Sequence, residues 1–335
     1  MTDNLVYTSE STKDFQTVSP NRLVRVAAEF AGTLLIVFAI YAMSTWAAII
    51  NSSSVIALVG IGTAAAYAAA SMSFGRASGG HFNPAVTFAG ILAGFTQWLD
   101  GVLYIVAQVL GALAAAGLWF LLTPTSSALS MTTWLGLVTN GFGSNSPSAT
   151  LMGSSSGISF GIKATIAVEL LFTVLVISAF FATSRAQGAV RKNHALAVGA
   201  AYGVGAMSSF IIDGAGMNPA RSTGIAVIGA TQGMTTNPLS QLWVFWVVPL
   251  VAAAAVSFGF IIRDSVRAQR AETEAAVAAL RAEKQLEDAQ EDSANAQDTV
   301  EESETDEKSA EVPEIVIESE TTQSEDTESD QTDEK

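Results

Sequence analysis

Two copies of the tripeptide Asn-Pro-Ala are the most distinctive chemical feature of the chain. They are Asn83-Pro84-Ala85 and Asn218-Pro219-Ala220, and glycines precede both. Asparagine is a preferred N-cap, and proline is tolerated at the first helical position because its missing N–H would be unpaired there. Each copy therefore predicts the start of a helix, with an amide side chain at the tip that can donate hydrogen bonds.

The rest of the chain supplies the helices that must position these starts. Half of the residues are hydrophobic and 14% are charged, with a mean hydropathy of +0.39, which is unusual for a soluble protein. A bilayer core needs about 20 apolar residues per helix. Six runs have about this length: Leu23–Met43, Val55–Phe74, Leu99–Leu122, Lys163–Thr183, His194–Ile212 and Gln241–Ile262. The stretches Pro84–Gly94 and Pro219–Ala230 have about half of it and cannot span alone.

The two halves of the chain repeat one order of elements. An apolar helix with one carboxylate (Glu29, Glu169), another apolar helix and then Asn-Pro-Ala occur once in each half. Three spans per half give the copies opposite orientations, so the two half-helices should meet N-terminus to N-terminus near the midplane. Non-helical backbone at that depth is permitted only beside protein or a water-filled cavity, which predicts an aqueous path.

This arrangement predicts electrostatic selection at the centre of the path. Each half-helix start carries roughly half a positive charge, which would repel cations, hydronium included. Each Asn amide would donate to the oxygen of a passing neutral molecule and so interrupt a proton wire.

The predicted fold is therefore all-α and membrane-embedded, with six transmembrane helices, two re-entrant half-helices and an inverted repeat. We expect a cytoplasmic N-terminal segment (1–21), a channel domain (22–262, repeats about 22–122 and 163–262), a cytoplasmic helical extension (263–291) and a disordered acidic tail (292–335). Residues 263–335 hold 24 acidic and 7 basic residues, a charge of −17, whereas residues 1–262 carry +2. The acidity thus belongs to the tail, whose partner the sequence does not identify.

Lys and Arg in the short loops predict the orientation. They gather on one side of the six-span arrangement, so both termini are expected to be cytoplasmic in a multi-pass protein of the cell membrane. The residues are Arg22, Arg25, Arg76, Arg185, Arg191, Lys192, Arg263, Arg267 and Arg270. The opposite loops Ser44–Ser54 and Thr123–Ile162 are rich in Ser, Thr and Gly. A third loop on that side follows the fifth span, and Asp213 is the further charge expected in it.

Catalysis is not expected. The chain has no cysteine, and no nucleophile–base pair or metal-ligand cluster is apparent. We therefore predict no cofactor, no metal, no nucleic acid partner and no enzymatic activity.

The sequence resembles the major intrinsic protein family, the aquaporins and glycerol facilitators, across about residues 22–262. The resemblance rests on Ala28–Thr33, Ser78–Thr87, Glu169 and Met217–Ser222. It implies a pore in each protomer, a homotetramer in the lipid bilayer, and water and small neutral solutes as the molecules that pass.

The resemblance also implies a selectivity filter. Arg221 follows the second motif at the position of the family's filter arginine, where a permanent charge would bind solute oxygens and repel cations. Counting back without gaps from the two Asn residues places Thr63, Ala206 and Ala215 at the other filter positions. Neither the aromatic–histidine set of water channels nor the aromatic pair of glycerol facilitators is present, and Ser222 replaces the facilitators' acidic residue. This predicts a wide, weakly polar filter.

Other polar residues in the apolar body have supporting interpretations. Glu29 and Glu169 are charges within spans, which invites a proton-relay role. The resemblance implies instead that each accepts backbone N–H bonds from the re-entrant segment of its own half, and this is the preferred interpretation. For His81, lining a vestibule and packing within its loop are equally favoured, and His194 is expected at the surface. Close helix crossing is the preferred interpretation of the GxxxG at Gly199–Gly203, over dimerisation.

Three alternatives stay open beside a passive channel for water and small neutral solutes that excludes ions and protons. One is a glycerol- or urea-type facilitator with a wide filter. Another is a coupled secondary transporter, which also uses inverted repeats but needs titrating or ion-binding groups at the midplane. The third is a junctional or scaffolding membrane protein with a closed pore.

Overall fold

Six long helices dominate the computed structural model, which describes residues 20–47, 52–184 and 190–306. Arg185, the N-terminal segment up to residue 19 and the acidic tail from residue 307 lie outside the described residues. Within the described part, six helices are long and apolar enough to cross a bilayer. They are α1 (Arg22–Ala42), α3 (Val55–Ser78), α5 (Trp98–Leu122), α8 (Ile162–Thr183), α9 (His194–Asp213) and α11 (Val244–Asp306).

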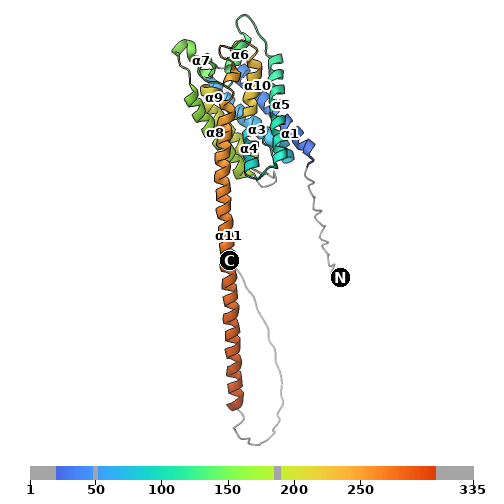
Figure 1. The fold of residues 1–335 in the computed structure, drawn as a ribbon, viewed down its shortest axis with the longest axis vertical. Coiled ribbons are helices and arrows are strands. Elements are labelled where there is room, and N and C mark those ends of the chain that lie inside the picture. Colours follow the sequence, from blue (N-terminus) through green and yellow to red (C-terminus); the bar gives the residue numbers. More distant parts are fainter. Residues whose placement is uncertain (1–19, 48–51, 185–189, 307–335) are drawn as a thin grey trace, which may run out of the picture. The chain divides into compact units, whose positions relative to one another are not determined.

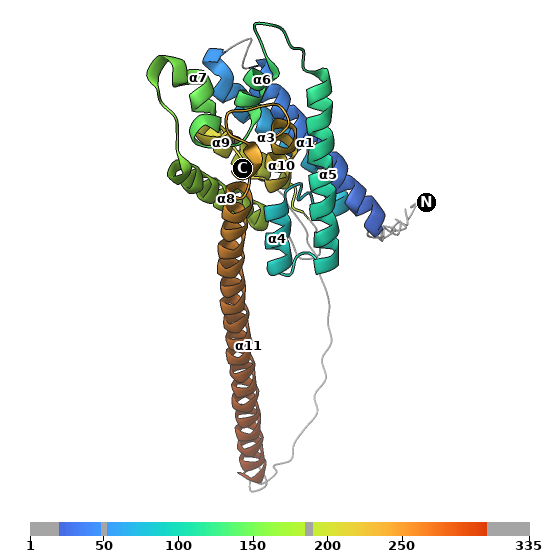
Figure 2. The same ribbon diagram turned by 45° about the horizontal axis from the view of Figure 1, so that its top comes forward.

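The two half-length segments form short helices. These are α4 (Pro84–Leu92) and α10 (Pro219–Gly229), each with asparagine at the N-cap and proline at the first helical position. α4 packs against α5 and α8, and α10 packs against α5 (Figures 1 and 2). The fold class predicted from the sequence is therefore confirmed.

The long helices bury small, aromatic and some branched aliphatic residues and expose other large aliphatic ones. Leu35, Ile61, Leu171, Leu196 and Val251 are each more than half exposed on the span helices. An exposed aliphatic surface of this kind suits a hydrocarbon solvent, because lipid tails are as apolar as the side chains.

Glycines let α3 and α9 approach closely. A Cβ added at Gly199 would lie 2.6 Å from the backbone oxygen of Ala64, and one at Gly203 would lie 2.7 Å from the Ala64 Cβ. The GxxxG therefore mediates a helix crossing inside one chain, which is the interpretation preferred from the sequence.

The segment Thr123–Ile162 contains more regular structure than its composition suggested. It forms α6 (Met131–Val138), a 3₁₀ turn (Gly143–Asn145) and α7 (Pro147–Ser156). Ser130 and Ser146 cap the two helices with side-chain hydrogen bonds, so the same polar residues that indicated a loop serve here as N-caps.

The chain divides into two units, one ending at Val266 and the other starting at Arg267. In the second unit the helix continues to Asp306, past the predicted helix boundary at residue 291. Residues 292–306 combine Ala, Glu and Gln, which are good helix formers, with Asp, Ser and Thr, which are poorer ones. Its described side chains, residues 267–290, are all exposed, including Leu280 and Leu286.

Candidate functional site

The two asparagines of the repeated motif cap the half-helices with their side-chain oxygens. Asn83 Oδ1 accepts a hydrogen bond from Ala85 N at 2.8 Å, and Asn218 Oδ1 accepts from Ala220 N at 3.0 Å and Arg221 N at 3.3 Å. Because each oxygen is held by its own helix, each Nδ2 amide group points away from it.

Those amide groups join the two motifs. Asn83 Nδ2 donates to Met217 O, and Asn218 Nδ2 donates to Phe82 O, each at 2.8 Å. Phe82 and Met217 directly precede the two asparagines and have φ values of 49° and 52°, a left-handed conformation that costs about 1–3 kcal/mol for a non-glycine residue. The reciprocal contacts bring the two half-helix starts together, as the inverted repeat predicts.

The second N–H of each amide is also used. Asn83 Nδ2 donates to Tyr202 OH at 2.7 Å, and Asn218 Nδ2 donates to Tyr67 OH at 2.9 Å. We expected these amides to be available to a passing solute. Instead, tyrosines from α9 and α3 take the positions that a solute oxygen would occupy.

Arg221 is buried beside the second motif and held on two sides. Its NH1 donates to Asn140 Oδ1, and its NH2 donates to Gly214 O at 2.7 Å. Its guanidinium also lies 5.8 Å from the centre of the Tyr41 ring, within cation–π range. Its Nε is buried and has no hydrogen-bond partner among the described residues.

The other predicted filter residues are also buried. Thr63 and Ala206 lie on α3 and α9, which pack along each other, and Ala215 directly follows the Gly214 carbonyl that binds Arg221. Thr63 Oγ1, like Arg221 Nε, has no partner within the described chain. The assignment of these residues to a wide, weakly polar filter stays a prediction.

Two residues that hold this region were missed by the sequence reasoning. Asn140 accepts from both Arg221 and Ser222 Oγ, the latter at 2.9 Å, and donates from Nδ2 to Asp213 O at 3.1 Å. Asp213, expected as a loop charge, is instead the buried last residue of α9, and its Oδ1 accepts from Ala215 N at 2.9 Å. An Asn-Gly pair at residues 140–141 was the local signal available for the first, and it indicates only a turn.

Each re-entrant loop is tied to a buried carboxylate of its own half. Glu29 accepts from His81 N at 3.0 Å and Phe82 N at 2.6 Å, and also from Ser78 Oγ and Gln108 Nε2. Glu169 accepts from Met217 N with both oxygens, at 2.9 and 2.8 Å. These are the contacts that the supporting interpretation requires, because they satisfy N–H groups of non-helical backbone.

The two histidines pack rather than line open space. His81 is 4% exposed, its Nδ1 lies 3.1 Å from Thr87 Oγ1, and its ring meets Tyr104 and Phe180 edge to face. Packing within the loop, one of the two interpretations, describes this position. His194 is buried as well, with Nδ1 2.8 Å from Thr183 Oγ1, so its expected surface position was wrong. It is the first residue of α9, and α8 packs against α9.

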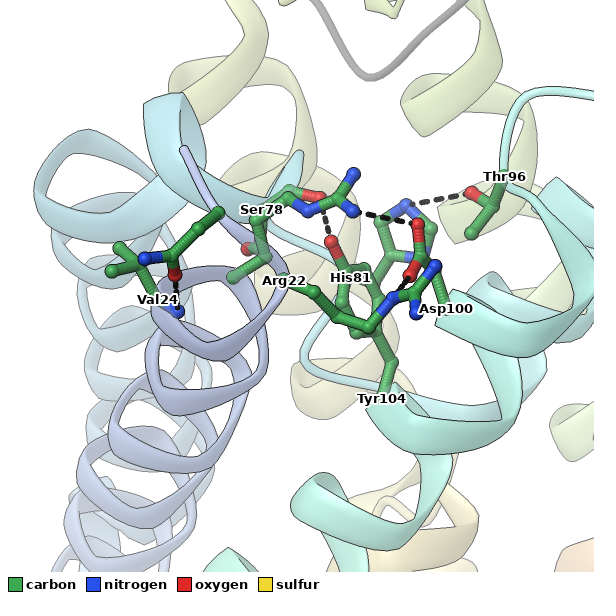
Figure 3. A network of polar contacts seen from close by, with 9 residues as sticks. Arg22, Val24, Ser78, His81, Thr96, Asp100 and Tyr104 are labelled. Carbon is green, nitrogen blue, oxygen red and sulfur yellow. Dashed lines mark hydrogen bonds and ion pairs between the residues drawn. The ribbon is translucent and has the colours of Figure 1, made fainter. Parts of the chain in front are cut away.

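A polar network ties the first turns of α1 and α5 to the loop before α4 (Figure 3). Asp100 is buried and pairs with Arg22 Nε at 2.5 Å and Arg25 NH2 at 2.8 Å. Tyr104 OH, one turn further along α5, donates to Ser78 O at 3.1 Å. Two arginines expected only as topology signals thus also fix α1 against α5.

The chemistry of the site is hydrogen bonding and electrostatics. Within the described ranges, no three His, Asp or Glu side chains gather as ligands of a metal ion would. Six spans and two half-helices joined start to start define the class of this protein, an α-helical membrane channel.

Comparison with known proteins gives the family. Residues 16–260 match the family described as "Major intrinsic protein". Aquaporin Z of Brucella melitensis is 32% identical over 72% of this chain and 100% of its own length, and mouse aquaporin-4 is 31% identical over 73% and 69%. The aquaglyceroporin structure from Plasmodium falciparum has a TM-score of 0.54 at 18% identity, covering 72% of this chain and 94% of that one, which concerns the fold.

The chain belongs to the major intrinsic protein family. It is a passive channel for water and small uncharged solutes.

Proposed function

We propose that this channel conducts water and small neutral molecules along a path between Asn83 and Asn218, and that it excludes ions and protons. The reciprocal bonds from Asn83 to Met217 O and from Asn218 to Phe82 O are the observation that carries the proposal. They hold two helix N-termini face to face, and each contributes roughly half a positive charge. A cation entering between them would lose hydration and meet the positive potential of both helix starts, whereas a neutral molecule would not be repelled.

Arg221 forms the second barrier to cations in this proposal. Its permanent charge is buried, and Asn140 and Gly214 fix its orientation. Arg221 Nε and Thr63 Oγ1 are buried without a partner among the described residues, and we propose that they bind the oxygen of a passing solute. With Ala206 and Ala215 as the remaining members, size exclusion at this filter is weak, so urea and glycerol are proposed to pass beside water.

The relatives' names bear on the choice of solute. Aquaporin Z and aquaporin-4 are named as aquaporins, and the similar solved structure is of an aquaglyceroporin. Both kinds of name fit the passive channel, and neither favours the glycerol facilitator over it. A coupled transporter gains no support from Glu29 or Glu169, because backbone and side-chain donors already occupy their oxygens.

The setting of the channel is also proposed. The cluster of Arg22, Arg25 and Arg76 at one end supports cytoplasmic termini in a cell membrane. Family membership supports a homotetramer with one path in each protomer. Crosslinking of the reconstituted chain would test the oligomer, and protease access to the C-terminal unit from the cytoplasmic side would test the orientation.

Stopped-flow light scattering on proteoliposomes tests the proposal. Osmotic water flux, urea uptake and glycerol uptake are measured against empty liposomes, and a pH-sensitive dye inside the vesicles reports proton leak. We expect all three neutral fluxes above the empty-liposome level with no added proton leak. Fast water flux with solute uptake at the empty-liposome level would overturn the weak-filter part, and proton leak would overturn the exclusion part.

A further inference from the structure

Two stacked tyrosines stand where the half-helices meet. Tyr67 on α3 and Tyr202 on α9 are each 1% exposed. Their ring centroids lie 3.4 Å apart and their planes within 5° of parallel. Aromatic pairs usually prefer offset or edge-to-face arrangements with centroids about 4.5–7 Å apart. Ring attraction alone therefore does not account for this geometry.

The backbone accounts for it instead. Gly199 and Gly203 face Ala64 where α3 crosses α9, and Tyr67 and Tyr202 lie within one turn of these residues. The glycines bring the two helices so near that side chains directed between them must stack. The rings are therefore pressed together by the same crossing that the GxxxG allows.

The tyrosine hydroxyls use up the donors of the motif. Each Asn amide has two N–H groups, and one of them binds a backbone carbonyl of the opposite loop. The other binds a tyrosine hydroxyl, Tyr202 for Asn83 and Tyr67 for Asn218. In this conformation neither asparagine has a donor left for a molecule on the path.

The pair follows the internal repeat of the chain. Tyr67 precedes Asn83 by 16 positions, and Tyr202 precedes Asn218 by the same 16. Each tyrosine bonds to the asparagine of the other half. The two residues are thus equivalent positions of the inverted repeat, and they contribute to one structural element at its centre.

We propose that the Tyr67–Tyr202 pair is the central constriction of the conduction path and the gate that a permeating molecule must open. The inference rests on the proposed path between Asn83 and Asn218. A water molecule on that path displaces both hydroxyls from the amides, and the rings must separate or turn aside before it passes. The pair therefore limits the rate of water flow, and the space left by the displaced rings limits solute size at the midplane.

The test compares two double variants with wild type. Tyr67→Val/Tyr202→Val removes the rings and the hydroxyls, and Tyr67→Phe/Tyr202→Phe removes the hydroxyls alone. Tyr104→Phe is the matched control, because it deletes a buried hydroxyl that bonds Ser78 O and neither asparagine. Osmotic water permeability per chain is measured in proteoliposomes over a range of temperatures, with urea and glycerol uptake alongside.

We expect the valine pair to raise water permeability about tenfold, since breaking the two hydrogen bonds no longer adds to the barrier. Its flux should depend less steeply on temperature than that of wild type, and solute uptake should rise. The phenylalanine pair should fall between wild type and the valine pair, and Tyr104→Phe should match wild type.

A folded valine pair with wild-type permeability and temperature dependence would overturn the gate. If the valine pair does not fold, an unchanged phenylalanine pair overturns it. The proposed function fails separately: when wild type and both folded variants all stay at the empty-liposome level, the path itself is refuted. Wild type above that level with a faster-conducting valine pair supports both the path and the gate.

Discussion

At the scale of single residues, the orientation of Arg221 depends on a side chain from a distant loop. Asn140 Oδ1 accepts from both Arg221 NH1 and Ser222 Oγ, and its Nδ2 binds Asp213 O. Replacing Asn140 with alanine leaves a buried guanidinium N–H unpaired, at a cost of about 1–3 kcal/mol or more. We expect Asn140→Ala to lower the unfolding temperature and to raise urea permeability relative to water permeability, measured by stopped flow.

Asn145 provides the control for that variant. It is also buried and lies in the same inter-helix segment, but its Nδ2 binds Thr236 O rather than the filter. Asn145→Ala should therefore lower stability without changing the ratio of urea to water permeability. If both variants leave this ratio at the wild-type value, Asn140 does not position the filter arginine.

The imidazole of His81 links stability to pH. Burial lowers the pKa of His81 to about 4, whereas an exposed histidine titrates near 6.5. The folded chain therefore binds fewer protons at this site than the unfolded chain between pH of about 4 and 6.5, and stability falls as the pH falls through that window. The contribution of this one group to the free energy of unfolding drops by about 2 kcal/mol between pH 7 and pH 5.

His81→Gln tests this linkage, because glutamine keeps a polar side chain that does not titrate. Thermal unfolding in detergent, followed by circular dichroism between pH 8 and pH 5, should show a smaller loss of stability on acidification in the variant than in wild type. Equal losses in the two proteins would assign the acid sensitivity to other buried groups.

At the scale of elements, the crossing of α3 and α9 depends on the absence of side chains. A Cβ at Gly199 on α9 would contact the backbone of Ala64 on α3. One at Gly75, which is on α3 like Ala64, would meet nothing within 4 Å. Both glycine-to-alanine changes raise helix propensity by about 1 kcal/mol. Their difference therefore isolates the cost of forcing the helices apart, about 1–3 kcal/mol for overpacking.

We expect Gly199→Ala to lower the unfolding temperature and Gly75→Ala to leave it unchanged or raise it. Thermal unfolding of the purified chains in one detergent measures both. A Gly199→Ala chain as stable as Gly75→Ala would mean that α3 and α9 can separate at no cost, and that glycine does not determine their distance.

At the scale of the whole molecule, the chain is an apolar channel unit followed by an acidic unit of separate character. Residues 267–335 carry a net charge of −17, and the described side chains of residues 267–290 are all exposed. The buried clusters of the described chain lie within residues 1–266. A chain that ends at Val266 should therefore keep the unfolding temperature and the water permeability of the full chain.

The measurements for that truncation are the unfolding temperature, stopped-flow water flux and binding to anionic vesicles. Loss of the acidic unit should increase binding to anionic lipid, because a repelling charge is removed. A fall in water flux at unchanged stability would instead give the tail a part in conduction.

Much of the fold was predictable because its signals are local. Runs of about 20 apolar residues follow from the thickness of a bilayer, and Asn followed by Pro marks a helix start wherever it occurs. The repeat of these signals in each half gave the orientation of the half-helices and the positions of Asn83, Asn218 and Arg221. The repeat also located Glu29 and Glu169, and the family resemblance implied their supporting role.

The helices and the tips of the half-helices could thus be placed from local signals, since each depends on residues that are neighbours in the chain. Which distant side chains meet those tips follows from the tertiary structure. Tyr67 and Tyr202 looked like bulky residues in alanine-rich spans, and Asn140 like part of a turn. Their hydrogen bonds join residues 81 to 151 positions apart, and chain-local propensity carries no information about such contacts.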